Sequence, residues 1–134
     1  MNTTYFKNLV AGNIFKTQTS PAIPTTYYLG LSTTLPDATG GNVSEPASSK
    51  GYARVNITSV LGAPADGVVS NTDKITFEEA SDAWGTISYY VLYDAATGGN
   101  LLKYGTLTKT MTVSANATVW FDIGSITFSV LDKT

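Results

Sequence analysis

Alternation of apolar and polar residues limits the folds open to this chain more than any other feature. Between residues 25 and 32, Tyr27, Leu29 and Leu31 alternate with polar or small residues, which is the pattern of a strand with one buried face. Stretches rich in β-branched and aromatic residues follow at residues 52–58, 74–77, 86–93, 101–107, 109–113, 118–122 and 125–131. Such residues favour strands. The sequence therefore predicts about eight short strands.

Residues that favour turns separate these strands. Gly, Asn, Asp or Ser occur in residues 95–100, 114–116 and 122–124, and these residue types adopt the backbone conformations of tight turns. No helical pattern lies between the strands. We therefore predict a mainly β protein, an antiparallel β-sandwich or jelly-roll-like barrel that spans residues 25–134.

The N-terminal residues 1–15 carry the only helical period. Thr3 is in position to cap a helix. The helical period places four apolar residues on one stripe: Phe6, Leu9, Val10 and Ile14. A helix this short is marginal alone, so it must pack on something. It either caps one end of the sheet or docks on a partner, as one of three copies around a symmetry axis or against a neighbouring protein. These four residues are the candidate docking residues.

Chain length limits the number of domains, and charge limits the kinds of partner the protein can bind. A chain of 134 residues with 43% hydrophobic content can bury one core, so we expect a single domain over residues 1–134. Eight Lys and Arg against ten Asp and Glu make nucleic acid and anionic membranes poor partners. No apolar run approaches the ~20 residues of a membrane span, and no signal peptide is recognised. We expect a product made in the cytoplasm.

The absence of Cys and His removes much chemistry. A chain with no Cys and no His has no thiolate nucleophile, no thiolate zinc site and no imidazole base. Three carboxylates lie close together at Glu78, Glu79 and Asp82. With Asp94 they suggest a hydrolase hypothesis, but a solvated loop explains them better because one loop rarely holds two acids at a fixed separation. We expect no catalytic residue, no metal and no cofactor.

Aromatic residues offer candidate contact surfaces. The chain has eight Tyr, five Phe and two Trp. In residues 86–93 the alternation places Tyr89 and Tyr93 with Ile87 and Val91 on the core face, and Tyr90 opposite them. Tyr28 and Tyr90 are therefore the candidate surface aromatics, able to contact a protein or a sugar ring. Both tryptophans, Trp84 and Trp120, are expected in the core.

Residues 33–51 form an irregular segment of a length that usually signals a functional or interfacial loop. Arg54, the only arginine, follows this segment. Its guanidinium can pair bidentately with a carboxylate, either Glu45 or Asp94. We interpret Arg54 and Glu45 as residues that organise the loop.

The order of several short motifs resembles a known group of proteins. Residues 28–37, 40–45 and 51–55 carry the motifs YLGLSTTLPD, GGNVSE and GYARV, and SNTDKITF, AWG and DAATGGNLL follow in residues 70–77, 83–85 and 94–102. In the order of these motifs, the chain is similar to small bacteriophage structural-module proteins, the group of tail fibre, minor virion and head-decoration proteins. The resemblance implies a virion component and names no catalytic residue.

Three functions are therefore open. The first is a non-enzymatic virion structural protein of the tail fibre or tip, the neck or the capsid surface, which binds other phage proteins and itself, with a trimer favoured by analogy. The second is a carbohydrate-binding module that attaches the particle to host-surface glycans through Tyr28, Tyr90 and residues 33–51. The third is the hydrolase.

Overall fold

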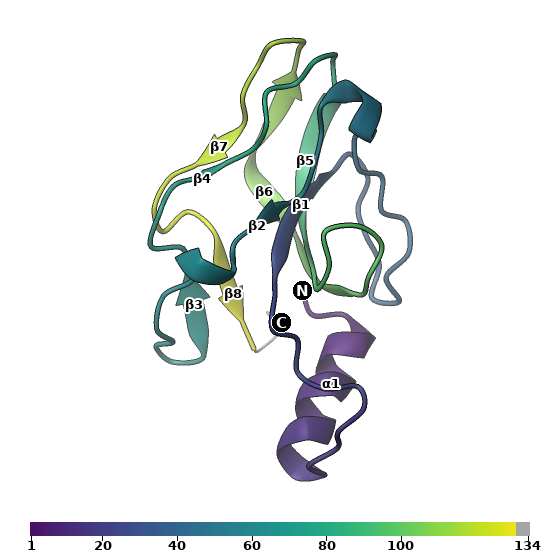
Figure 1. The fold of residues 1–134 in the computed structure, drawn as a ribbon, viewed down its shortest axis with the longest axis vertical. Coiled ribbons are helices and arrows are strands. Elements are labelled where there is room, and N and C mark those ends of the chain that lie inside the picture. The colour runs from purple at the N-terminus through teal and green to yellow at the C-terminus, as the bar shows by residue number, and fades with distance from the viewer. Residues whose placement is uncertain (131–134) are drawn as a thin grey trace.

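The computed structural model describes residues 1–130. It contains one α-helix and eight strands, with two short 3-10 helices, η1 (Ser48–Lys50) and η2 (Thr58–Val60), in the loops. The elements are drawn in Figure 1. The helix and strands are α1 (Thr4–Phe15), β1 (Tyr28–Ser32), β2 (Val55–Asn56), β3 (Val68–Ser70), β4 (Ile75–Thr76), β5 (Gly85–Tyr93), β6 (Leu101–Val113), β7 (Trp120–Phe121) and β8 (Thr127–Ser129).

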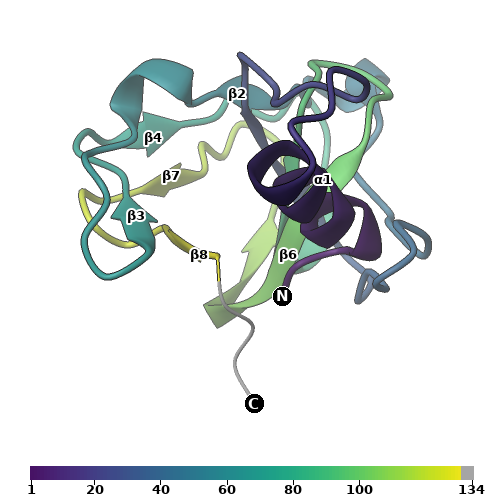
Figure 2. The ribbon, with the colours of Figure 1, turned by 90° about the horizontal axis from the view of Figure 1, so that it is seen from below.

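All strand pairs within the described residues are antiparallel. The main sheet has the order β2-β1-β5-β6, and two small sheets pair β3 with β8 and β4 with β7. Figure 2 shows the small sheets facing β6 across the body, which is the layered arrangement of a β-sandwich. The prediction of a mainly β, antiparallel fold with about eight strands and one N-terminal helix is confirmed.

Individual strands differ from the prediction. The stretches 101–107 and 109–113 form one continuous strand, β6, because Thr108 continues the extended backbone between them. β3 was not predicted, since Val68 and Val69 follow a Gly- and Pro-rich segment that suggests a loop. The predicted strand at residues 125–131 is shorter, and its last residue, Leu131, lies outside the described residues.

A bulge in the hairpin of β5 and β6 changes which residues face the main core. Ile87 pairs with Met111 and Tyr89 with Thr106, so four residues of β6 lie opposite Ser88 alone. Ile87 and Leu92 belong to the main cluster, whereas Val91 and Tyr93 belong to a second cluster across the sheet. The predicted grouping of Ile87, Val91 and Tyr93 on one face was therefore wrong, because a bulge shifts the two-residue alternation.

The helix α1 starts at its predicted cap and leaves the body of the protein. The Thr3 hydroxyl accepts a hydrogen bond from the Phe6 amide at 3.2 Å, and the cap is itself buried. Leu9 is buried in the main cluster. The C-terminal turn points away from the sheets (Figure 1), where the Phe15 side chain is 82% exposed. The part of the helix around Leu9 thus covers the core, and its C-terminal turn projects into solvent.

Candidate interaction surfaces

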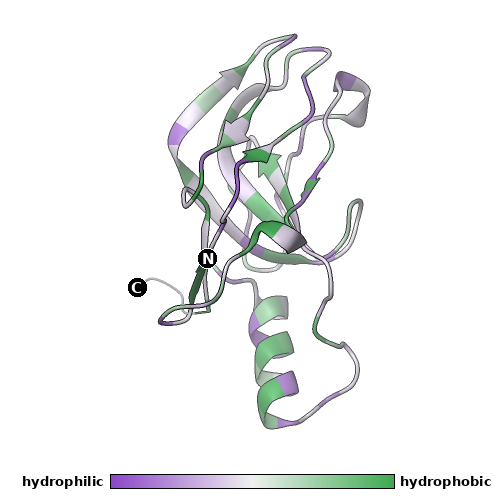
Figure 3. Cartoon of the chain, turned by 60° about the vertical axis from the view of Figure 1, so that its left-hand side comes forward, coloured by the Kyte–Doolittle hydropathy of each residue, from purple (hydrophilic) through white to green (hydrophobic). Residues whose placement is uncertain are grey.

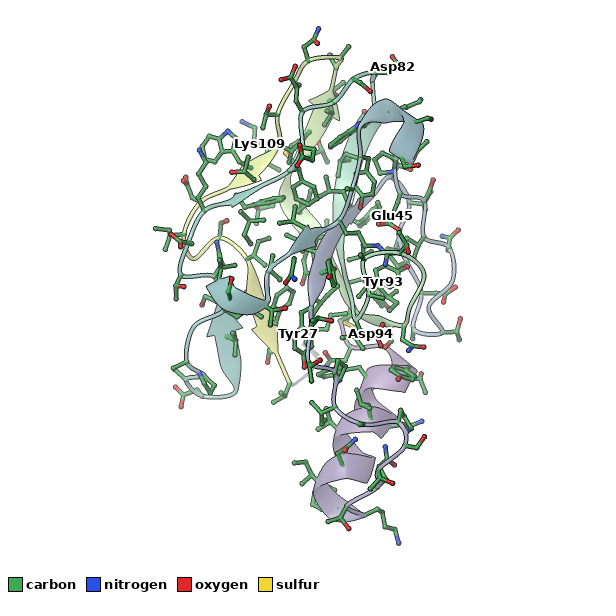
Figure 4. All side chains as sticks on the ribbon, in the orientation of Figure 1. Tyr27, Glu45, Asp82, Tyr93, Asp94 and Lys109 are labelled. Carbon is green, nitrogen blue, oxygen red and sulfur yellow. The ribbon has the colours of Figure 1, made fainter. Side chains whose placement is uncertain are left out.

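The Arg54 cluster, formed by Glu45, Tyr52, Arg54 and Tyr93, joins the long loop to the main sheet. Arg54 donates from Nε to Glu45 Oε1 at 2.9 Å and from Nη2 to Glu45 Oε2 at 2.8 Å. Its guanidinium lies 3.5 Å from the centre of the Tyr93 ring. Figure 4 shows Glu45 and Tyr93 close together on this side of the molecule. Of the two partners considered for Arg54, the structure pairs it with Glu45; Asp94 instead accepts from the Asn100 amide.

The same cluster reaches two further segments. Arg54 Nη1 donates to the carbonyls of Ala95 and Gly98 in the β5–β6 turn, at 2.9 and 2.8 Å. The Tyr52 hydroxyl donates to Glu45 at 2.6 Å and accepts from the Leu31 amide at 3.0 Å. Four of the five guanidinium N–H donors therefore bond to Glu45, Ala95 and Gly98, so the main role of the arginine is to tie these loops together.

Protonation in this cluster follows from burial and charge. Burial raises the pKa of Tyr52 far above its ordinary value, and the neighbouring Glu45 charge and hydrogen bond raise it further. Burial alone would lower the pKa of Arg54, but the hydrogen bonds and charge of Glu45 outweigh it and the pKa is raised. Tyr52 stays a neutral phenol and Arg54 a cation throughout the physiological range.

Residues 33–51 hold their shape largely through their own hydrogen bonds. Asp37 accepts from the Thr39 hydroxyl at 2.6 Å and from the amides of Thr39 and Gly41. The hydroxyl of Thr39, and then the amides, lower the pKa of Asp37. Thr33 donates to the Ser44 carbonyl at 3.0 Å across the base of the loop. The segment is a compact surface loop with its own network of bonds.

The four candidate docking residues of the helix do not lie on one free face. Leu9 is buried, Phe6 and Val10 are half-buried, and only Ile14 is exposed, at 66%. The Phe6 ring packs under the Lys103 ammonium, with 4.9 Å between the nitrogen and the ring centre. The predicted stripe therefore divides between the protein's own core and solvent.

A second exposed apolar surface is one that the sequence reading missed. The helix tip is formed by Ile14 and Phe15, whose side chains are 66% and 82% exposed, and Ile23 in the segment that follows the helix is 46% exposed. Figure 3 shows hydrophobic and hydrophilic bands alternating along the whole of α1, down to its projecting end. Phe15 falls off the helical stripe, and Ile23 follows the helix in an extended segment, so period alone does not group them.

Tyr28 and Tyr90 lie on opposite faces of the main sheet. Tyr28 pairs with Tyr93, which belongs to the second cluster. Tyr90 packs against the main cluster, with its ring centre 6.0 Å from that of Phe128. Both are half-buried. They cannot form one flat platform for a sugar, and the placement of Tyr90 on an open surface was wrong because of the bulge.

The two tryptophans also separate. Trp84 is buried, packs edge-on against Tyr52 with ring centres 5.4 Å apart, and donates to the Lys50 carbonyl. Trp120 is 47% exposed, and Lys74 Nζ lies 4.0 Å from the centre of its ring. The prediction of a core position is confirmed for Trp84 and wrong for Trp120, because β7 pairs through two residues only and its outward face meets solvent.

Trp120 lines a groove that we call the β6 groove. It has a volume of about 580 Å³ and runs between β6 and the segment that contains β7 and leads into β8. Tyr90 and Ile126 contribute apolar surface, while Lys109 and Asp122 contribute charge. Figure 4 shows Lys109 on the side of the molecule opposite Glu45.

The acidic residues do not assemble a reaction centre. Glu78, Glu79 and Asp82 are exposed on one loop, and Asp94 lies toward the other end of the molecule (Figure 4). No group of three potential metal ligands occurs within residues 1–130. Within the same residues, no helix combines the length and hydropathy needed to cross a bilayer. The hydrolase hypothesis built on these four carboxylates has no converging pair to support it.

The fold is an antiparallel β-sandwich with one N-terminal helix, and it carries exposed apolar side chains and a groove beside β6. A family model described as podophage GP4 fiber I protein gp80 matches residues 1–129. The chain therefore belongs to this family of bacteriophage fibre proteins, and the resemblance to phage structural proteins is confirmed. A search of the curated proteins found no match.

Proposed function

We propose that this protein is a non-enzymatic, single-domain component of the phage fibre that acts by binding other virion proteins, and that it is made in the bacterial cytoplasm. The family supports a structural role in the particle. The observation that carries the mode of action is the helix tip, where Phe15 is 82% and the adjacent Ile14 66% exposed. Large apolar side chains gathered at a projecting end are typical of an interface.

We assign the helix tip, together with Val10, to the contact that attaches the protein in the particle. Helices of three copies meeting at their tips would cover these side chains, and so would a groove on a neighbouring protein; we favour a homotrimer. Leu9 and Thr3 are parts of the protein's own core, so they hold the helix in place for this contact. The loop of residues 33–51, held by Arg54 and Glu45, is the second surface available to partners.

Point variants at the tip test this assignment better than a deletion, because removing the helix would also remove Leu9 from the core. We expect Ile14→Asp with Phe15→Asp to lower incorporation into particles at least tenfold, about 1.4 kcal/mol or more of lost contact energy. A matched control is Lys7→Asp with Asn8→Asp, on an exposed turn nearer the body. Normal incorporation of the tip variant, with its fold intact by circular dichroism, would refute the proposal.

Carbohydrate binding is the second candidate, favoured by one observation. Trp120 is half-exposed at the edge of a groove with charged and hydroxyl side chains, a combination that can stack on and hydrogen-bond to a sugar. Binding of the isolated protein and of Trp120→Ala to a glycan array tests it. Specific binding that the variant loses supports the candidate, and no binding by either protein removes it.

A further inference from the structure

The outer edge of β6 is already used by the chain itself along its first part. The Tyr104 amide donates to the Met1 carbonyl at 3.1 Å, and the Thr3 amide donates to the Leu102 carbonyl at 3.0 Å. Between these two bonds, Asn2 forms an antiparallel bridge with Lys103. Residues 1–3 therefore lie along β6 as a short added strand, and Figure 2 shows the N-terminus beside it.

The second part of the same edge has no such cover within the described residues. β6 is the last strand of its sheet, and beyond residue 104 its recorded backbone pairing is with β5 and Trp84. Leu102 and Tyr104 turn their backbone groups outward, so Thr106, two residues on, does the same. An unpaired edge of this kind is a template for another strand.

The β6 groove lies along this uncovered edge. Its β6 wall runs from Thr106 to Met111, and its other wall comes from residues 120–122 and 125–127. β7 and β8 each pair with one strand only, so each also has an unpaired edge. A groove between strands with unfilled backbone positions matches the shape and the hydrogen-bonding needs of an extended polypeptide.

We propose that the β6 groove receives an extended segment of another virion protein, which pairs as an added strand with the outer edge of β6 from Thr106 into the bulged residues that line the groove. This inference rests on the proposed function, since it requires that the protein be assembled in a particle. Alternate side chains of the segment would face Leu107, Met111 and Trp120, which supply the apolar lining.

A second copy of this chain fits the groove less well than a free segment. Symmetric antiparallel pairing centred on Lys109 would place two ammonium groups opposite each other, which destabilises a strand pair. A lysine on an exposed edge is a common device against self-pairing.

Amide hydrogen exchange, measured on the isolated protein and on intact particles, tests the proposal. We expect peptides covering residues 105–113 to exchange at least about tenfold more slowly in particles, because paired amides open only with the added strand. Residues 55–56 of β2, at the opposite edge of the same sheet, are the matched control and should change little. Equal exchange at residues 105–113 in both samples would overturn the proposal.

Other outcomes separate the alternatives. If slowing appears in the isolated protein as its concentration rises, the occupant is a second copy and the proposal is wrong. If a host-surface glycan preparation slows exchange there and the particle does not, the groove binds sugar and the proposal is again wrong. If mass spectrometry finds no copies of the chain in particles, the proposed function itself fails; presence without protection overturns only the groove assignment.

Two variants sharpen the test. Thr106→Pro removes an outward amide without removing a bond to β5, and Thr108→Arg fills the groove without altering the backbone. Each should lower incorporation at least about tenfold. Thr76→Arg, exposed on β4 and outside the groove lining, is the control. Circular dichroism and the urea midpoint show whether each variant is folded; wild-type incorporation of a folded Thr108→Arg would overturn the proposal.

Discussion

The two sides of the main sheet satisfy their polar groups in different ways. On the side of the Arg54 cluster, side chains reach across three segments and bond to carboxylate, carbonyl and amide partners. Along the β6 groove, by contrast, the edge beyond Tyr104 has no recorded backbone cover among residues 1–130. Internal bonds fix shape, whereas unused backbone groups are available to a partner. Stability should therefore depend on the first side and assembly on the second.

The largest expected effect comes from removing Arg54. Arg54→Ala leaves Glu45 partly buried without its cation and frees the carbonyls of Ala95 and Gly98. We expect a loss of about 3 kcal/mol in the free energy of unfolding, measured by urea denaturation. Arg54→Lys should lose less unfolding free energy, since it keeps the positive charge although it lacks the planar guanidinium that binds a carboxylate with two hydrogen bonds. Lys109→Ala, for which no ion pair is recorded, is the control and should change stability by less than about 0.5 kcal/mol.

If Arg54→Ala is as stable as the unaltered protein, the contrast between the two sides is wrong. A similar cost for Lys109→Ala would also contradict it, because the groove side would then be equally important for stability.

A smaller effect is expected at Gly30, a buried position of β1 against the Arg54 cluster. A Cβ there would lie 2.7 Å from both Glu45 Oε1 and the Tyr52 hydroxyl and 2.9 Å from Val91. Gly30→Ala should therefore cost about 2 kcal/mol, because three neighbours must shift together. Unfolding in urea measures the loss. An unchanged midpoint would show that the cluster can move as a unit.

Alkaline pH tests the same side through Tyr52. Its folded pKa is raised by burial and by Glu45, so the phenol binds its proton more tightly when folded. This contribution is fully present below the unfolded pKa of about 10 and is lost as pH rises above it. We expect a loss of about 1 kcal/mol by pH 11 from this residue.

Absorbance at 295 nm reports tyrosine ionisation directly. Tyr52→Phe should weaken the alkaline loss of stability, while Tyr5→Phe, a residue outside the Arg54 cluster, should leave it unchanged. An equal loss in both variants would mean that Tyr52 is not the group responsible.

Of the two sides of the main sheet, the sequence predicts the side of the Arg54 cluster better than the side of the β6 groove. The first depends on local sequence patterns, whereas the second depends on pairing between distant strands. Alternation identified β1 and its buried Leu29 and Leu31, and charge chemistry narrowed the Arg54 partner to two carboxylates. The bulge, where residues 107–110 of β6 lie opposite Ser88 alone, has no signal in the alternation of residues 86–93, because it depends on pairing with a distant strand. It displaced Tyr90 from its expected face. The β6 groove depends on strands far apart in sequence, so no motif announces it.

Trp120 provides the smallest predicted effect and the sharpest contrast with a core aromatic. Its ring is 47% exposed and carries Lys74 Nζ at 4.0 Å. Trp120→Ala should therefore cost about 1 kcal/mol, and a double-mutant cycle with Lys74→Ala should give a coupling of about 0.5 kcal/mol. Incorporation into particles should fall much more than stability does, because the ring lines the β6 groove. A loss of stability above about 3 kcal/mol, typical of a buried tryptophan, would mean that Trp120 supports the fold rather than a partner.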